Sequence, residues 1–154
     1  MPETKIELRV LDASEFDPKK SHAAKGNWPK QKLHISHLRE EDFKVSGLRA
    51  YALSRDLGMA EATGGMVDAH VNRRGRPFDA AEVAHRHFHD TQFQLVYVLK
   101  GWAKMEFEGQ GEVTMREGSC WIQPPGIKHT VLGFSDDYEI FEIIIPAKYD
   151  TYNL

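Results

Sequence analysis

The feature that most constrains this fold is a series of short segments of alternating apolar and polar residues, each followed by residues typical of turns. Turn signals such as Arg116-Glu117-Gly118 and Pro124-Pro125-Gly126 reverse the chain between them. Strands recurring roughly every eight to twelve residues indicate an antiparallel barrel or sandwich, since parallel strands need long crossovers. We therefore predict an all-β fold whose main strands cover 94–99, 102–107, 112–115, 119–123, 129–134 and 138–145.

The N-terminal part of the chain is less regular. Residues 12–32 carry Pro, Gly, Asn, Lys and Asp with few hydrophobic residues, which predicts an irregular surface arm able to wrap a neighbouring subunit. His34 and His37 are expected at the surface. At 154 residues the chain is long enough for one domain. Further strands are expected at 5–10, 32–38, 48–55 and 66–72, and the domain is divided into an N-terminal strand and arm (1–45), a β-barrel core (46–147) and a tail (148–154).

Three histidines, His85, His87 and His89, stand at alternate positions. In an extended segment their imidazoles share one face, and neutral imidazole is the commonest protein ligand for transition metals. A helix starting at Asp79 would instead stack His85 and His89 four residues apart, which is also a zinc spacing. The strand is favoured because 94–99 is rich in β-branched and aromatic residues, and because the glutamate of a His-Glu-x-x-His helix is missing.

Strand parity predicts the wall of a substrate pocket. Gln94, Val96 and Val98 fall on one side of their strand, so the site should be largely apolar and suited to a small substrate. His70 shares a face with Asp68, which is either a site-lining pair or a solvated face. No general acid or base is unambiguous, so the catalytic residues stay unknown, with Glu106, His70 and Tyr97 as candidates. The pocket candidates are Val96, Val98, His85, His70 and Met105.

Composition excludes several partners. A formal net charge of −3 gives no basic field for nucleic acid or an anionic membrane surface. No apolar run approaches the roughly 20 residues of a membrane span, and the first residues lack the apolar core of a signal peptide, so we expect a cytoplasmic protein. Cys120 is the one cysteine, which excludes an intrachain disulfide, and its apolar neighbours predict a buried thiol.

Two motifs in the middle third of the chain resemble those of the cupin superfamily. The first, Gly-x5-His-x-His-x3-4-Glu-x6-Gly, is matched by His87, His89, position 94 and Gly101. The second, Gly-x5-Pro-x-Gly-x2-His-x3-Asn, is matched by Gly118, Pro124, Gly126 and His129. The sequence departs from the pattern where Gln94 replaces the glutamate ligand, where Gly133 replaces the asparagine, and where the first glycine of the first motif is absent.

The resemblance implies a double-stranded β-helix, or jelly-roll barrel, with one metal held by His87, His89, His129 and Gln94. It also implies a homodimer. The neutral amide of Gln94 leaves the metal's charge uncompensated, which favours an anionic chelating substrate. This ligand set is similar to that of three-histidine cupin dioxygenases, so a non-haem dioxygenase is the leading expectation. Fe²⁺ is the favoured metal, and Zn²⁺, Mn²⁺ and Ni²⁺ are alternatives. A non-oxidative isomerase or lyase and a non-catalytic metal- or ligand-binding module stay open.

Overall fold

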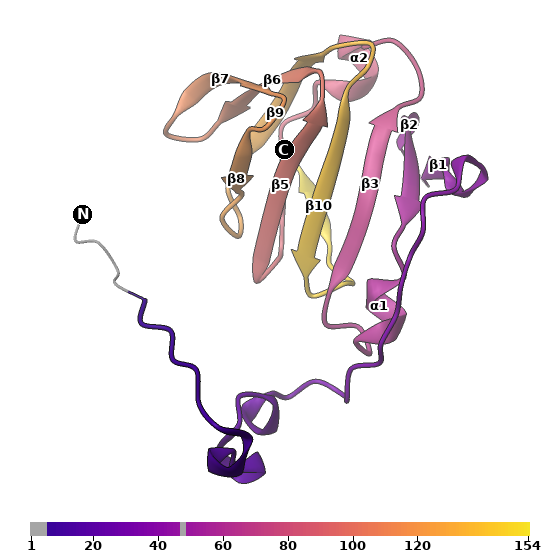
Figure 1. The fold of residues 1–154 in the computed structure, drawn as a ribbon. Coiled ribbons are helices and arrows are strands. Elements are labelled where there is room, and N and C mark those ends of the chain that lie inside the picture. The colour runs from indigo at the N-terminus through magenta and orange to yellow at the C-terminus, as the bar shows by residue number, and fades with distance from the viewer. Residues whose placement is uncertain (1–5, 47–48) are drawn as a thin grey trace.

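The computed structural model describes residues 6–46 and 49–154, whose strands form two antiparallel sheets lying one in front of the other (Figure 1). One sheet has the order β1-β2-β3-β10-β5-β8 and the other the order β11-β4-β9-β6-β7. The strands of the first sheet are β1 (Lys44–Ser46), β2 (Arg49–Asp56), β3 (Asp68–Arg74), β10 (Glu139–Ile145), β5 (Phe93–Lys100) and β8 (Cys120–Ile122). Those of the second are β11 (Thr151–Asn153), β4 (His87–His89), β9 (His129–Phe134), β6 (Trp102–Phe107) and β7 (Gly111–Arg116).

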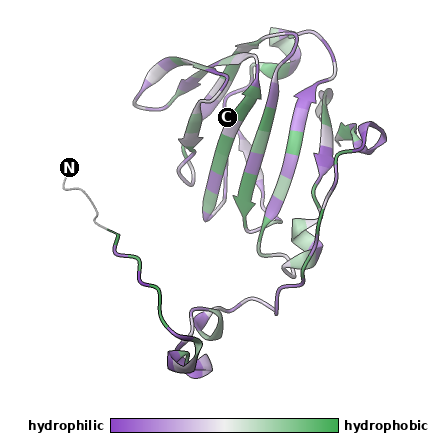
Figure 2. Cartoon of the chain, in the orientation of Figure 1, coloured by the Kyte–Doolittle hydropathy of each residue, from purple (hydrophilic) through white to green (hydrophobic). Residues whose placement is uncertain are grey.

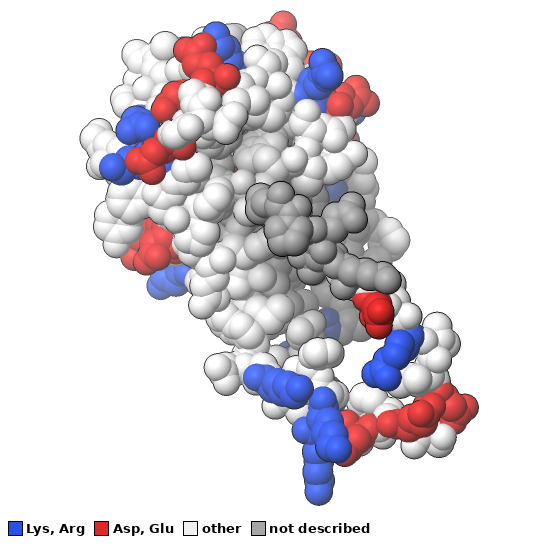
Figure 3. Space-filling model, turned by 90° about the vertical axis from the view of Figure 1, so that its left-hand side faces the viewer, with Lys and Arg blue, Asp and Glu red and all other residues white. Residues whose placement is uncertain are grey.

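The two α-helices, α1 (Met59–Ala62) and α2 (Ala80–Val83), are one turn long and lie at the ends of the sheets (Figure 1). Short 3-10 turns occur before the first strand, at Ala13–Glu15, Pro18–Lys20, Ala23–Lys25 and Glu40–Asp42. Within the described residues, no helix is both long and apolar enough to cross a membrane. On the face of the molecule in Figure 3, acidic and basic side chains are mixed rather than gathered into a patch of one sign.

The core lies between the sheets, and the hydrophobic pattern of β5 explains why. Gln94, Val96 and Val98 are buried at alternate positions, as strand parity predicts, because their side chains point toward the opposite sheet. Val96 and Val98 pack with Met105 and neighbouring residues. Apolar residues dominate β5 and β10, whereas β3 is largely hydrophilic (Figure 2). The all-β jelly roll is therefore confirmed, although the described strands form two separate ladders rather than one closed barrel.

The N-terminal segment differs from the prediction. The described residues of the expected strands 5–10 and 32–38 have no strand structure, and Ile6, Leu8 and Val10 are almost fully exposed in an arm extending away from the sheets (Figure 1). An alternating pattern cannot by itself form a strand, because the backbone needs a neighbouring strand for its hydrogen bonds. Lys5 and Leu48, the first residues of two expected strands, lie outside the described residues. His34 and His37 are exposed, as predicted.

Two segments at sheet edges add to the sequence-based picture. The segment 148–154, expected as a tail, contains β11, whose residue Thr151 pairs with His89 of β4. Cys120 is exposed rather than buried. Its strand β8 lies at the edge of the first sheet, where Trp121 lines the cavity between the sheets and Cys120, as its neighbour in the strand, points to the opposite face.

Candidate metal centre

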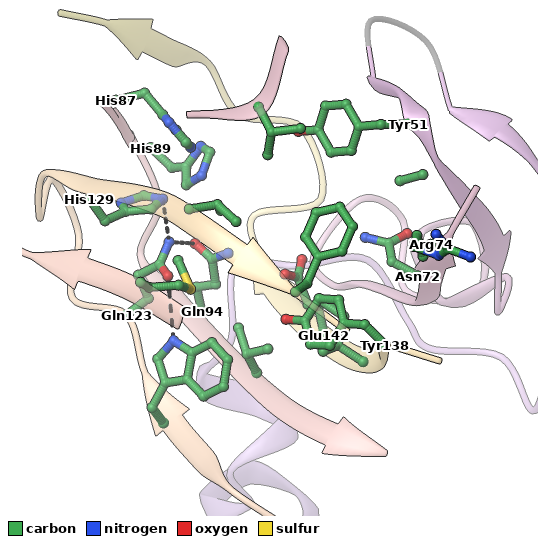
Figure 4. A pocket seen from close by; sticks show the side chains of 18 of the residues that line it. Tyr51, Asn72, Arg74, His87, His89, Gln94, Gln123, His129, Tyr138 and Glu142 are labelled. Carbon is green, nitrogen blue, oxygen red and sulfur yellow. Dashed lines mark hydrogen bonds between the residues drawn. The ribbon is translucent and has the colours of Figure 1, made fainter. Parts of the chain in front are cut away.

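Three histidines from two adjacent strands meet between the sheets. His87 and His89 are the first and last residues of β4, and His129 is the first residue of β9. His87 lies directly opposite His129 in the antiparallel pair that these strands form. One potential ligand atom from each residue lies within 4.8 Å of the other two, and the rings point toward one another (Figure 4). The structure thus brings together the three histidines of the expected ligand set, whereas His85 lies outside the cluster.

Local sequence explains how the two strands reach this position. Asp79 caps α2 by accepting a hydrogen bond from the Ala81 N–H, but the helix ends after one turn and β4 begins at His87. The helix therefore stops before the histidines and does not stack His85 on His89, and the strand interpretation applies to His87 and His89. Before β9, the chain turns at Gly126, whose φ of +76° favours glycine and whose N–H donates to the His89 carbonyl at 3.1 Å. This turn places His129 beside β4.

Each of the three imidazoles is held through its Nδ1 atom by a neutral oxygen. Nδ1 lies 2.6 Å from the His85 carbonyl oxygen in His87 and 2.9 Å from the Ile127 carbonyl oxygen in His129. In His89 it lies 2.7 Å from the Thr151 hydroxyl. A carbonyl accepts only, so Nδ1 of His87 and His129 carries the proton and their Nε2 carries the lone pair. Such anchoring is what orients metal-binding histidines in proteins.

The donor set fits a divalent transition metal. Imidazole nitrogens bind such ions at roughly 2.0–2.1 Å, so two nitrogens on one ion lie at most about 4.2 Å apart. The 4.8 Å limit of the cluster exceeds this by about half an ångström, which side-chain rotation supplies. His89 and His129 are buried and His87 is partly exposed, so the cluster opens toward one side. Three neutral donors would leave further coordination positions for water or a substrate.

A glutamine pair continues the polar wall beside His129. The Gln123 amide Nε2–H donates to His129 Nε2 at 3.1 Å and to Gln94 Oε1 at 3.3 Å. Trp121 Nε1–H reaches the other atom of the same amide, Oε1, at 3.5 Å (Figure 4). Both glutamines are almost fully buried. Gln94 is thus connected to the cluster through Gln123.

These residues line one cavity between the two sheets, with a volume of about 110 Å³. Apolar side chains make much of its wall, with the histidines on one side and Tyr51, Asn72 and Arg74 on the other (Figure 4). This size limits an occupant to a small molecule, and the mixture of apolar wall and few polar groups is typical of ligand sites. The remaining lining side chains include Val96, Met105, Val131, Phe134, Tyr138 and Ile140.

The other pocket candidates are placed elsewhere. Val98 is fully buried in the core next to Val96 but does not reach the cavity. The side chain of His85 is exposed and turns back to the Ala81 carbonyl at 2.9 Å. The alternation of side chains between two faces applies only within a strand. Because β4 begins at His87, this alternation does not place His85 on the same face as His87 and His89. Of the candidate acids and bases, Glu106 forms an ion pair with Arg86 at 3.1 Å.

His70 lies in a second polar cluster, next to the cavity wall. Its Nδ1 is 2.9 Å from Asp68 Oδ2 and its Nε2 is 3.0 Å from Glu142 Oε2. Burial acts to lower the pKa of His70, but the hydrogen bonds and charges of Asp68 and Glu142 outweigh burial and raise this pKa to about 10. Burial also raises the pKa of Tyr138, and the charge of Glu142 adds to that effect. The pair of His70 and Asp68 is therefore half-buried and ionic rather than solvated.

Sequence reasoning missed three residues of this region: Gln123, Thr151 and Glu142. Gln123 directly follows β8 and precedes the proline turn, and its backbone N–H donates to the Gln94 carbonyl at 3.0 Å, so the motif could have revealed it. Glu142 is a charge in the middle of β10 with apolar residues on both sides of it in the sequence, which is a signal of a buried functional group. Thr151 gave no signal, because its contact with His89 depends on β11.

A family model for the cupin domain matches residues 78–139. This range contains the three histidines and both glutamines. No curated protein matches the chain in sequence.

Solved structures with a similar fold are distant in sequence. KdgF from Halomonas sp. has a TM-score of 0.56 and 17% identity over 73% of this chain and 96% of its own. The polyketide cyclase RemF from Streptomyces resistomycificus has a TM-score of 0.60 and 17% identity over 78% and 85%. A salicylate 1,2-dioxygenase from Pseudaminobacter salicylatoxidans has a TM-score of 0.53 and 9% identity over 67%, and this chain spans 30% of that protein. At these identities the similarity concerns the fold.

Proposed function

The chain belongs to the cupin superfamily, and on this premise we propose that it is a metal-dependent enzyme that acts on a small chelating molecule bound between its two sheets. One observation carries the proposal: His87, His89 and His129 converge while a neutral oxygen holds Nδ1 of each. Histidines that only fill a core do not need three separate anchors with potential ligand atoms within 4.8 Å of one another. The adjoining cavity supplies room for a substrate.

The first candidate chemistry is oxygenation by a non-haem Fe²⁺ dioxygenase. Support comes from the neutral ligand set, since Gln94 stands where a carboxylate would compensate the metal's charge. A metal with uncompensated charge favours an anionic chelating substrate and retains open positions. A protein of similar fold is a salicylate 1,2-dioxygenase, which agrees with this chemistry by analogy of fold alone.

The second candidate is a non-oxidative isomerase or lyase with Zn²⁺, Mn²⁺ or Ni²⁺. A specific observation favours it: the cavity is lined by the carboxylate of Glu142, which such chemistry can use for proton transfer. RemF, another protein of similar fold, is a polyketide cyclase, so the fold accommodates more than one reaction.

Metal analysis tests the proposal and separates the two candidates. Protein purified without a metal-chelating tag should contain about one transition-metal ion per chain. Oxygen uptake is then followed over a panel of diketones, thiols and 2-oxo acids. Iron with substrate-dependent oxygen uptake supports the dioxygenase, and zinc, manganese or nickel without uptake supports the second candidate. A metal-free protein that gains no ion from added Fe²⁺ or Zn²⁺ would reject both.

The arm supports a further part of the proposal, which is that two copies associate as a homodimer. Ile6, Leu8 and Val10 alternate along an extended segment and are 77%, 90% and 101% exposed. Their burial against a second copy would remove apolar surface from water, a gain of roughly 25 cal/mol per Å². Light scattering of the full chain should give the mass of a dimer. Leu8→Glu should shift that mass toward a monomer, and a monomeric wild-type protein contradicts this part.

A further inference from the structure

Glu142 is the carboxylate among the described residues that line the cavity, and its position is firmly set by the sheet. It lies in β10 between His70 of β3 and Val96 of β5, which are its direct partners in the two ladders. Its side chain is 11% exposed and lies across the cavity from the histidines (Figure 4). Burial of a carboxylate destabilises the fold unless the carboxylate is paired, so a buried carboxylate is often retained for a function.

The pairing of Glu142 defines its charge. The two ring nitrogens of His70 face carboxylate oxygens of Asp68 and Glu142, and the raised pKa of His70 makes the ring an imidazolium at neutral pH. Both N–H groups of the ring then donate to these carboxylates. Asp56, which pairs with His70 in β2, is the other titratable residue facing it from a neighbouring strand. The cavity wall therefore carries an ionised carboxylate, that of Glu142, whose orientation is fixed by its contact with His70.

We propose that Glu142 is the proton-transferring residue of this cavity, and that the substrate is a small carbonyl compound with an acidic C–H bond. His70 and Asp68 are positioning residues in this arrangement. The proposal rests on the proposed metal-dependent function, and it applies to both candidate chemistries because each can begin by enolisation. It adds the substrate class and the residue that removes the proton.

The proposed step balances without an oxidant or a co-reactant. The C–H bond next to the carbonyl breaks, its electron pair forms the enolate, and the proton moves to the carboxylate of Glu142. The resulting carboxylic acid beside the imidazolium of His70 returns the proton readily, either to another carbon in an isomerisation or to a departing hydroxyl that leaves as water. Positioned acid–base groups of this kind contribute about 10²–10⁴-fold to a rate.

The geometry of the cavity defines the substrate further. With the histidines on one side and Glu142 on the other, the substrate has its oxygen atoms at one end and the acidic carbon toward the other. Apolar residues such as Val96, Met105 and Phe134 lie along the wall and suit a short hydrocarbon body. Small 2-oxo acids such as 2-oxobutyrate have this arrangement.

Deuterium exchange tests the step. Zn²⁺-loaded protein in D₂O is incubated with 2-oxobutyrate and 2-oxovalerate, and loss of the C3 proton signal is followed by NMR. Zinc is redox-inactive, so oxygen chemistry does not interfere. The wild-type protein should exchange C3 protons above the rate of buffer with Zn²⁺. Glu142→Gln should lower that rate about 100-fold while Zn²⁺ stoichiometry is unchanged.

The controls separate this proposal from the proposed function. Glu139→Gln removes a carboxylate from the same strand outside the cavity lining and should exchange at the wild-type rate. Glu142→Asp keeps the charge that faces His70 but moves the carboxylate back by one methylene, so the exchange rate should fall about 10-fold. This variant tests the role of Glu142 even if Glu142→Gln does not fold. Wild-type exchange in both Glu142 variants overturns the role of Glu142. A Zn²⁺-loaded wild-type protein without exchange overturns the substrate class, and a protein that binds no Zn²⁺ overturns the proposed function itself.

A second readout does not depend on activity. Nitrogen-15 NMR of the histidine rings, in metal-free protein at pH 8, should show His70 with both nitrogens protonated. Glu142→Gln should lower the pH at which His70 loses a proton, and His37→Gln should leave it unchanged. A neutral His70 at pH 8 in the wild-type protein overturns the ionic arrangement on which the proposal depends.

Discussion

The histidines that lie between or within the two sheets are in two contrasting environments. In the metal cluster, neutral oxygens contact Nδ1 of His87, His89 and His129, so the rings can stay neutral and keep a lone pair on Nε2. His70 contacts a carboxylate through each of its nitrogens, and its pKa is raised to about 10. An imidazolium has no lone pair for a metal. The oxygen atoms that a histidine ring contacts, neutral or carboxylate, thus decide whether the ring is suited to bind a metal or carries a charge.

Removal of a cluster histidine should have the largest effect. His87→Ala, His89→Ala and His129→Ala should each weaken metal binding by about 100-fold or more, since loss of a ligand exceeds the 10–100-fold loss caused by changing its supporting contact. Isothermal titration with Zn²⁺ measures this. His34→Ala and His37→Ala, at exposed positions of the arm, are matched controls. Unchanged affinity in any of the first three variants would remove that residue from the metal site.

Replacement of His70 should affect stability rather than metal binding. His70→Gln leaves Asp68 and Glu142 without the imidazolium between them, which should destabilise the fold by about 3 kcal/mol near neutral pH. Urea unfolding at pH 6 measures the loss. Equal stability of the variant and the wild type would show that the arrangement around His70 is not ionic.

The pH dependence of the same variant has a defined sign. Because the pKa of His70 is raised in the folded protein, its stabilising effect is complete below pH 6.5 and is lost as pH rises toward about 10. The wild-type protein should lose its stability advantage over His70→Gln across this range. Urea unfolding at pH 6, 8 and 10 should give converging values for the two proteins, and a gap that widens with pH would contradict the assignment.

Loss of a supporting contact in the metal cluster should have a smaller effect. Thr151→Val keeps the shape of the side chain but removes the hydroxyl that lies 2.7 Å from His89 Nδ1. We expect about 10-fold weaker Zn²⁺ binding, because the ring loses its orientation but stays a ligand. Thr114→Val, on an exposed part of β7, is the control. Wild-type affinity in Thr151→Val would mean that β11 does not support the cluster.

The smallest effect on the metal itself is expected at Gln94. Gln94→Glu adds a negative charge beside the cluster, so metal binding should be kept or strengthened while affinity for an anionic substrate falls severalfold. Gln94→Ala should retain the metal and lose less affinity for that substrate. Metal stoichiometry and binding of 2-oxobutyrate to both variants measure this. Equal or tighter substrate binding by the Glu variant would make the amide incidental to function.

Local signals revealed the metal cluster because its parts lie within two short segments. Alternation fixes the relation of His87 to His89, and a proline turn delivers His129 to the neighbouring strand. Parity likewise predicted which side of β5 is buried, including Gln94 and Val96. These relations depend on residues close in sequence or on strand geometry.

The second polar cluster depends on pairing between distant segments. His70 and Glu142 are 72 residues apart and meet because β3 and β10 are neighbours in the sheet, an order that periodicity does not specify. The pairing of His89 with Thr151 is of the same kind. The strand prediction for the arm failed for a related reason, since the pattern around Leu8 is compatible with a strand but no strand of the described residues lies beside it.

Zinc titration of protein with nitrogen-15-labelled histidine rings observes both histidine environments at once. One equivalent of Zn²⁺ should shift the Nε2 signals of His87, His89 and His129, while His70 keeps the signals of an imidazolium at pH 8. Absence of shifts at the three cluster histidines, or a zinc-induced shift at His70, would contradict the division into a metal-binding cluster and a charged histidine.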